Sequence, residues 1–203
     1  MIVILTADII NSRKLSSKKW IDDLKALLLT FGKSPNDWEI YRGDEFQMEI
    51  KNPEDALFIA FQIKAFFKSI NLDVRMSLGF GDKTYKTRKI TESNGTAFVR
   101  SGETFENLKK QKLNLVLNTG NTAFDEELNL MLKLSLSFMD NWLQQSAEFV
   151  LIAIQNPTLS QEEIGVKLGI NQAAVSRRQK RSNFELMMQV EHYFRKKIKT
   201  LEV

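Results

Sequence analysis

Hydrophobic and polar positions alternate at period two in several parts of this chain, and this pattern predicts β-strands. Alternation over residues 38–50, interrupted at Arg42-Gly-Asp-Glu45, indicates a hairpin with a tight turn. Residues 72–81 alternate again and end in glycines, which indicates a strand whose backbone passes close to a turn or to a ligand phosphate. The continuous apolar run over residues 1–10 is typical of a central strand covered on both faces, and residues 113–117 form the last predicted strand.

Apolar residues at helical spacing predict helices over residues 17–31, 53–70 and 95–110. Asn52-Pro53 supplies a cap and a first-turn proline for the second of these helices. The order is therefore strand, helix, hairpin, helix, strand, helix, strand. This order predicts an α+β protein, an α/β sandwich with a ferredoxin-like sheet that carries helices on one face.

After residue 120 the pattern is helical throughout. Residues 125–153 predict one long helix with more than one apolar face, which leads from the first part of the chain to the last. Ser160-Gln-Glu-Glu163 is a capping box, and Gly169 and Asn171 predict a left-handed turn and the cap of a new helix. We therefore predict a first domain over residues 1–120 and, over residues 121–203, a linker helix with an all-α helix-turn-helix domain.

Composition excludes several kinds of chemistry. The 203 residues include no cysteine, so disulfides, thiolate metal sites and a cysteine nucleophile are excluded. The single histidine, His192, excludes a metal site built from several histidines. No apolar run reaches the roughly 20 residues of a membrane span, and residues 1–10 lack the basic start and cleavage site of a signal peptide. We therefore expect a cytoplasmic protein with no membrane partner.

The net charge of +4 lies entirely in the last part of the chain. Residues 160–203 contain nine Lys or Arg and five Glu, whereas residues 1–159 are balanced. A basic segment attached to a neutral body indicates a polyanionic partner, although a solvated charged helix has the same composition.

Asp8 is the one charged residue in the apolar run at residues 1–10. A buried ionised carboxylate is costly unless it is paired or holds a metal. One hypothesis is that Mg²⁺ or Mn²⁺ bridges Asp8 and Asp44 of the hairpin turn, because hard cations prefer carboxylates together with substrate phosphate oxygens. The alternative is that Asp8 caps the segment that follows it and that Asp44 and Glu45 are ordinary turn residues.

Residues around the hairpin carry a resemblance to known proteins. A first strand ending in Ala7-Asp8-Ile9, followed by a helix and a hairpin with Gly43-Asp-Glu-Phe46, resembles the palm domains of nucleotidyl cyclases and GGDEF proteins. The resemblance implies that Asp8 and Asp44 are metal ligands and that a nucleotide lies near Arg42, Gly43 and Glu45. Arg42 departs from the pattern, since GGDEF proteins have a glycine there. Arg75, in the predicted strand over residues 72–81, is either a phosphate ligand or a salt-bridge partner.

Over nearly its full length the chain resembles the SatD family of small bacterial proteins, which combine such a palm domain with a helix-turn-helix. The matching segments are residues 5–12, 42–47, 74–81 and 95–98.

Residues 161–178 resemble the helix-turn-helix of bacterial repressors, in which the second helix enters the major groove of DNA. Arg178 departs from that pattern because an apolar residue usually anchors the helix there. The predicted DNA-contacting residues are Gln161, Gln172, Ala173, Ser176, Arg177, Lys180 and Arg181.

Three functions remain open from the sequence. The first is a DNA-binding regulator, expected to be a homodimer on double-stranded DNA, whose palm-like domain senses a nucleotide or mediates assembly. The second is a metal-dependent nucleotidyl cyclase or nucleotidyltransferase acting on a nucleoside triphosphate. The third is a scaffold with neither activity, because a fold does not determine a function.

Overall fold

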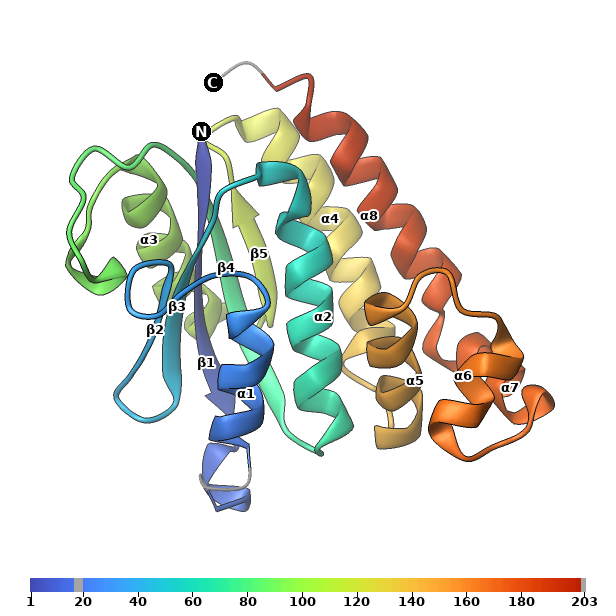
Figure 1. Cartoon of the computed structure of the whole chain (residues 1–203). Helices are drawn as coiled ribbons and strands as arrows, with labels where there is room; N and C mark the ends of the chain where they lie inside the picture. Colours follow the sequence, from blue (N-terminus) through green and yellow to red (C-terminus); the bar gives the residue numbers. More distant parts are fainter. Residues whose placement is uncertain (17–19, 202–203) are drawn as a thin grey trace.

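The chain forms a five-stranded mixed sheet with helices packed on both of its faces (Figure 1). The computed structural model describes residues 1–16 and 20–201, so the first three residues of the helix predicted over 17–31 lie outside the described residues. The strands are β1 Ile2–Ile10, β2 Trp38–Tyr41, β3 Glu45–Ile50, β4 Asp73–Gly81 and β5 Leu115–Asn118. The helices are α1 Ile21–Leu29, α2 Ala56–Ser69, α3 Thr96–Gln111, α4 Thr122–Met139, α5 Gln144–Gln155, α6 Gln161–Leu168, α7 Gln172–Ser182 and α8 Phe184–Ile198.

The sheet has the strand order β2-β3-β1-β4-β5. β1 is the central strand, as predicted, and pairs antiparallel with both β3 and β4. β4 pairs parallel with β5 across the connection made by α3. This register places Asp8 directly between Glu45 of β3 and Arg75 of β4.

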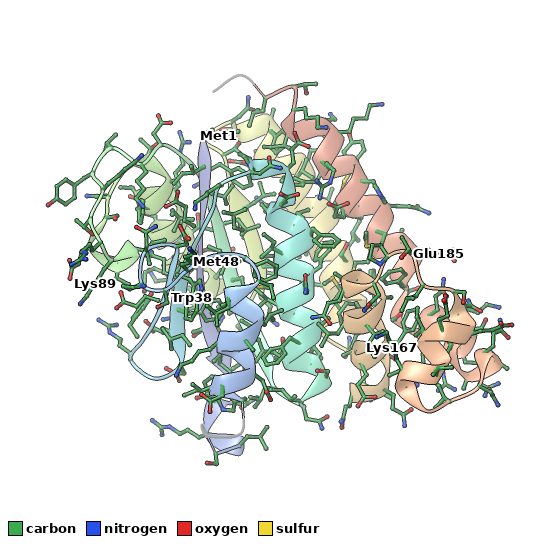
Figure 2. The ribbon with its side chains drawn as sticks, in the orientation of Figure 1. Met1, Trp38, Met48, Lys89, Lys167 and Glu185 are labelled. Atoms are coloured by element: carbon green, nitrogen blue, oxygen red, sulfur yellow. The ribbon has the colours of Figure 1, made fainter. Side chains whose placement is uncertain are left out.

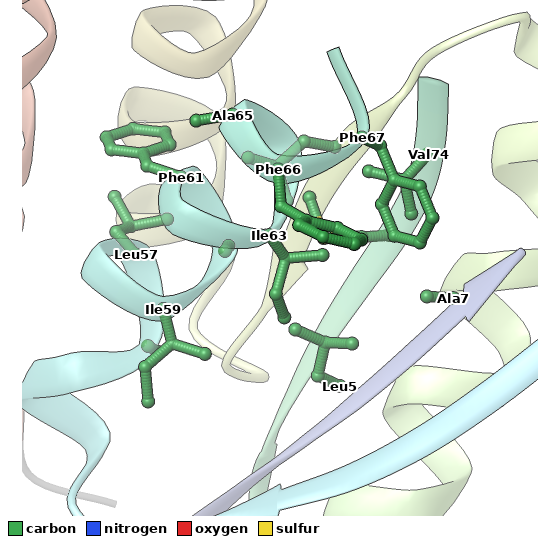
Figure 3. Close-up of a cluster of buried hydrophobic side chains, with 14 of the residues drawn as sticks. Leu5, Ala7, Leu57, Ile59, Phe61, Ile63, Ala65, Phe66, Phe67 and Val74 are labelled. Atoms are coloured by element: carbon green, nitrogen blue, oxygen red, sulfur yellow. The ribbon is translucent and has the colours of Figure 1, made fainter. Parts of the chain in front are cut away.

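Alternate residues of β1 face two different layers. Val3, Leu5, Ala7 and Ile9 belong to the main core, and Figure 3 shows Leu5 and Ala7 on the side of β1 that faces α2. The even-numbered residues face α3, where Ile4 packs with Ala97 and Phe98. The expectation that all helices lie on one face is therefore wrong.

Two glycines in β4 allow α3, the helix on the second face of the sheet, to pack closely against the strand. A Cβ atom at Gly79 would lie 2.3 Å from the Ala97 carbonyl oxygen, and one at Gly81 would lie 2.4 Å from the Thr96 hydroxyl. Ser77 of β4 and Ser101 of α3 continue the contact, with a hydrogen bond of 2.8 Å from the Ser77 hydroxyl to the Ser101 carbonyl. The segment that passes close to these glycines is thus α3.

The predicted long helix over residues 125–153 is divided in two. α4 ends at Met139, and α5 begins at Gln144 after four residues that change the direction of the chain. Asp140, in this break, pairs with the buried amine of Lys64 in α2, and the Trp142 indole donates to the Ser182 carbonyl at 2.9 Å. The break directs α5 along α2 (Figure 1).

The hydrophobic core is continuous from β1 to α8, so residues 1–120 and 121–201 share one core. α8 lies alongside α4 and reaches the sheet, where the rings of Phe194 and Phe80 pack edge to face at 6.0 Å (Figure 1). Among the described residues, no helix is both long and apolar enough to cross a membrane.

Candidate functional sites

The hairpin turn lies at the edge of the sheet where β1 ends. Arg42 and Gly43 both have positive φ angles, 52° and 86°, as the central residues of a tight hairpin turn require. Glycine adopts this conformation without strain, whereas arginine does so rarely. The turn is hydrogen-bonded to the end of β1, because the Ile9 amide donates to the Asp44 carbonyl oxygen at 2.9 Å.

The two predicted metal ligands line the same cavity, which has a volume of about 510 Å³. The Asp8 carboxylate is paired with the Arg75 guanidinium at 3.1 Å, and the Asp44 carboxylate accepts a hydrogen bond from the Ser12 hydroxyl at 2.9 Å. Arg75 is thus the salt-bridge partner of Asp8. Asn11, Ser12 and Arg13, which the sequence did not single out, also line this cavity.

Burial dominates the electrostatics of this edge. It raises the pKa of Asp8 above 3.8, and the cations Arg75 and Lys109 only partly oppose this effect. Burial, assisted by the Glu45 carboxylate, also raises the pKa of Tyr41 to about 12. Glu45 itself lies between Lys109 and Arg42, at 3.6 and 3.8 Å.

The remaining predicted nucleotide ligands do not line this cavity. Arg42 extends into solvent with 80% of its side chain exposed, and Gly43 has open space around it. Glu45 faces Lys109, a residue of the last turn of α3 that sequence reasoning missed. The only signal for it was its place in a predicted helix, and the sequence did not indicate which side of the sheet that helix covers.

Two carboxylates on one cavity match the way proteins hold Mg²⁺ with the help of substrate phosphates. Across residues 1–16 and 20–201 there is no group of three or more His, Asp or Glu side chains that can hold a metal ion. If a metal binds at this cavity, Asp8 and Asp44 are the carboxylates that would hold it.

The second candidate site is the pair of helices α6 and α7. The capping box is present, because the Ser160 hydroxyl accepts from the Glu163 amide and the Glu163 carboxylate accepts from the Ser160 amide at 2.8 Å. Gly169 ends α6 with a φ of 65°, and Asn171 caps α7 by accepting from the Ala174 amide at 2.9 Å. The boundaries predicted for both helices are confirmed.

Close approach of the two helices depends on Gly165. A Cβ atom there would lie 2.6 Å from the Ile170 carbonyl oxygen. Val175 of α7 is fully buried beneath this crossing. Arg178, where an apolar anchor was expected, instead pairs with Glu148 of α5 at 3.1 Å and donates to the Gln145 carbonyl.

The predicted DNA-contacting residues occupy the outer face of this pair. Ser176 and Gln161 are half-buried, and the others, Gln172, Ala173, Arg177, Lys180 and Arg181, are exposed. Gln161 donates to Gln179 at 2.7 Å and accepts from Gln172 at 2.6 Å, which links the two helices at their surface. Figure 2 shows Lys167 of α6 on the opposite side of the molecule from Trp38, the first residue of the hairpin strand β2.

A scan against family models, a search of curated proteins and a search of solved structures each returned no match to this chain.

Proposed function

We propose that this chain is a DNA-binding transcription regulator, in which α7 enters the major groove and the sheet domain senses a ligand or mediates assembly. The observation that carries the proposal is the outer face of α7. This helix contains four basic residues and no acidic one. Within the described part of the chain, Arg177, Lys180 and Arg181 make no ion pair, so they are available to a polyanion.

The side chains on this face have the chemistry of base readout. Arginine matches guanine and glutamine matches adenine through paired hydrogen bonds, so Arg177 and Gln172 are assigned to base edges. Ala173 and Ser176 lie beside them, and Lys180, Arg181 and Gln161 are assigned to phosphates or the groove rim.

Duplex binding by the full chain tests this function. Affinity for DNA is measured by fluorescence anisotropy on a selected sequence and on a scrambled one, at several salt concentrations. Arg177→Ala should cost about 1–3 kcal/mol on the selected sequence and relax the preference, because it removes a base contact. Arg181→Ala should weaken both duplexes alike and reduce the salt slope by about one.

Lys196→Ala is the matched control, since Lys196 is an exposed cation of α8 on a different helix. An Arg177→Ala variant with unchanged affinity and unchanged preference refutes the assignment of α7 as the recognition helix.

A homodimer is part of the same proposal, because helix-turn-helix proteins read two half-sites with two copies. Leu130 and Leu134, one turn apart on α4, are both more than half exposed and offer an apolar contact for a second copy. Sedimentation equilibrium of the wild type and of Leu134→Glu measures this, and a monomeric wild type at micromolar concentration contradicts it.

The resemblance to the SatD family and to cyclase palm domains supports a ferredoxin-like sheet domain with a nucleotide ligand. The element order from β1 to β4, β-α-β-β-α-β, is that of a ferredoxin-like unit. Asp8 and Asp44 on one cavity favour the alternative function, a nucleotidyl cyclase or transferase that uses Mg²⁺ or Mn²⁺ to polarise a triphosphate.

Incubation with ATP or GTP and either metal, followed by chromatography of the products, separates these functions. Turnover that is lost in Asp44→Asn supports the enzyme. Binding without turnover supports the sensor, and the absence of both supports a scaffold.

A further inference from the structure

A second cavity, of about 430 Å³, lies next to the first and shares Ile10, Asn11 and Arg75 with it. It is bounded by the α2–β4 turn, the α3–β5 turn and the break between α4 and α5. The residues that matter for its chemistry are Asn11, Asn71, Arg75, Lys112, Asn114 and Trp142. Its volume is within the range of pockets that hold small molecules.

Hydrogen-bond donors without partners gather at this cavity. Arg75 uses Nη1 to bind Asp8, but its Nε is buried and has no hydrogen-bond partner. Over the described residues, the side chains of Lys112, Asn11 and Asn114 make no hydrogen bond or ion pair within the chain. Asp73, the one carboxylate that lines the cavity, is already neutralised by Lys64 at 2.6 Å and Lys68 at 3.7 Å.

A site of this composition favours a small oxyanion. Lys112 supplies a positive charge that no described carboxylate pairs with, whereas Arg75 already shares its charge with Asp8. The amides of Asn11 and Asn114 supply neutral donors that orient the anion. The planar guanidinium and the lysine ammonium are the groups that proteins use most for phosphate. The Arg75 Nη2 makes no hydrogen bond with the described residues and is the guanidinium nitrogen that an anion can contact, whereas the buried Nε is not accessible from the cavity.

Three residues around the cavity have a left-handed backbone. Asn11, Asn71 and Lys112 have φ angles of 63°, 59° and 55°. Asparagine tolerates this region, and Lys112 is the residue that ends α3, where a left-handed conformation is common. Lysine has no special tolerance for this region, so the lysine is the unusual residue of the three.

One side chain connects the cavity to the recognition helix. Trp142 lines the cavity, and its indole Nε1 donates to the Ser182 carbonyl at 2.9 Å. Ser182 is the last residue of α7, and both Trp142 and Ser182 are buried. Trp142 therefore contacts both the cavity and the C-terminal end of the helix that carries Arg177 and Arg181.

We propose that this second cavity binds a small phosphate-bearing anion, and that Trp142 transmits its occupancy to the end of α7 and so alters DNA binding. The binding step is independent of the function proposed above, whereas the effect on DNA rests on it.

Binding is tested first, without DNA and in the presence of a chelator. Isothermal titration of the full chain with inorganic pyrophosphate should show one saturable site, and ADP as a second arm shows whether a nucleoside adds affinity. Lys112→Gln should weaken binding about tenfold, because it removes one charged contact. Lys110→Gln is the matched control, since Lys110 is an exposed lysine in the last turn of α3, two residues before Lys112, and does not line the cavity.

The chelator separates this site from the neighbouring Asp8 and Asp44 cavity, whose ligand would require a metal. The absence of binding at millimolar pyrophosphate overturns the proposal, as does equal binding by Lys112→Gln.

Transmission is measured by hydrogen exchange of residues 179–182, with and without pyrophosphate. The wild type should change its protection at the end of α7 on binding. Trp142→Phe should still bind pyrophosphate but lose that response, because it lacks the indole donor. Trp20→Phe is the control, since it alters another buried tryptophan whose Nε1 has no partner.

If Trp142→Phe does not fold, Lys112→Gln at a non-saturating concentration tests whether the response at α7 requires an occupied cavity, and a response that persists without binding overturns the transmission step. A response in Trp142→Phe equal to that of the wild type overturns the transmission step. A chain that binds pyrophosphate and responds at α7 but binds no duplex refutes the DNA-binding function alone.

Discussion

Asp37 holds the entry of the hairpin against the end of α1. Its carboxylate accepts from the Lys33 amide at 2.8 Å and from the Asn36 side chain, and it pairs with Lys51 at 2.9 Å. Gly32 makes room for it, because a Cβ atom at Gly32 would lie 2.6 Å from the Asp37 Cβ. Burial disfavours ionisation of Asp37, but these hydrogen bonds outweigh it and hold the pKa of Asp37 below 3.8.

Asp37→Asn should lower the free energy of unfolding by about 1–2 kcal/mol at pH 7, since a charged acceptor of several hydrogen bonds is lost. A lowered folded-state pKa gives stability that is present above the unfolded value of 3.8 and is lost as the pH falls through the folded value. The difference in the free energy of unfolding between wild type and variant, measured by urea titration, should therefore become smaller below pH 3.8. Asp23→Asn, at an exposed residue of α1, is the control, and a difference that stays constant with pH contradicts the assignment.

The sequence showed that Asp8 needs a partner, but it did not show which one. The partner depends on strand register, and register places Arg75 directly opposite Asp8 only once β1 and β4 are paired. The glycines at the end of β4 gave a similarly incomplete signal. They predicted a close approach, but they did not distinguish α3 from a turn or a ligand.

Elements whose ends are set by nearby residues were predictable. The caps of α6 and α7 use side chains within three residues of the helix start, so Ser160 and Asn171 identify both helices from the sequence alone. The break between α4 and α5 is different. It depends on Lys64, far away in the chain, and on the contact of Trp142 with Ser182, and neither leaves a local pattern.

The Arg178–Glu148 pair attaches α7 to α5, at a position where the sequence pattern predicted an apolar anchor. A double-mutant cycle with Arg178→Gln and Glu148→Gln should give a coupling energy of about 0.5–1 kcal/mol, because both side chains are partly exposed. Unfolding in urea at low and high salt measures it, and the coupling should decrease with salt.

Arg177→Gln paired with Glu148→Gln is the matched cycle, since Arg177 is the exposed neighbour of Arg178 on α7. If the coupling energy of Arg177 with Glu148 is as large as that of Arg178, the coupling comes from the general charge of α7 and not from the Arg178–Glu148 contact.

On the scale of the whole molecule, a buried charge joins α2 and the sheet to the break between α4 and α5. Lys64 is 1% exposed and binds Asp73 at the start of β4 and Asp140 at the end of α4. A second set of ion pairs links Arg195 of α8 to Asp55, ahead of α2, at 2.8 Å, and to the buried Glu191. The sequence predicted two domains from the change of pattern near residue 120, but pattern alone does not show that the two parts share a core.

We therefore expect the whole chain to unfold in one transition. Far-ultraviolet circular dichroism, which reports mainly on the helices, and tryptophan fluorescence should give the same urea midpoint. Two of the tryptophans, Trp20 and Trp38, lie before residue 120, and Trp142 lies after it.

Lys64→Met should lower the free energy of unfolding by about 3 kcal/mol, because it leaves two carboxylates without their buried partner. It should lower both midpoints together, whereas Lys133→Met, at an exposed lysine of α4, should change them little. Separate transitions in the wild type contradict the shared core. A Lys64→Met variant that unfolds only α5 to α8 at low urea shows instead that Lys64 is the main attachment between the helix-turn-helix region and the sheet.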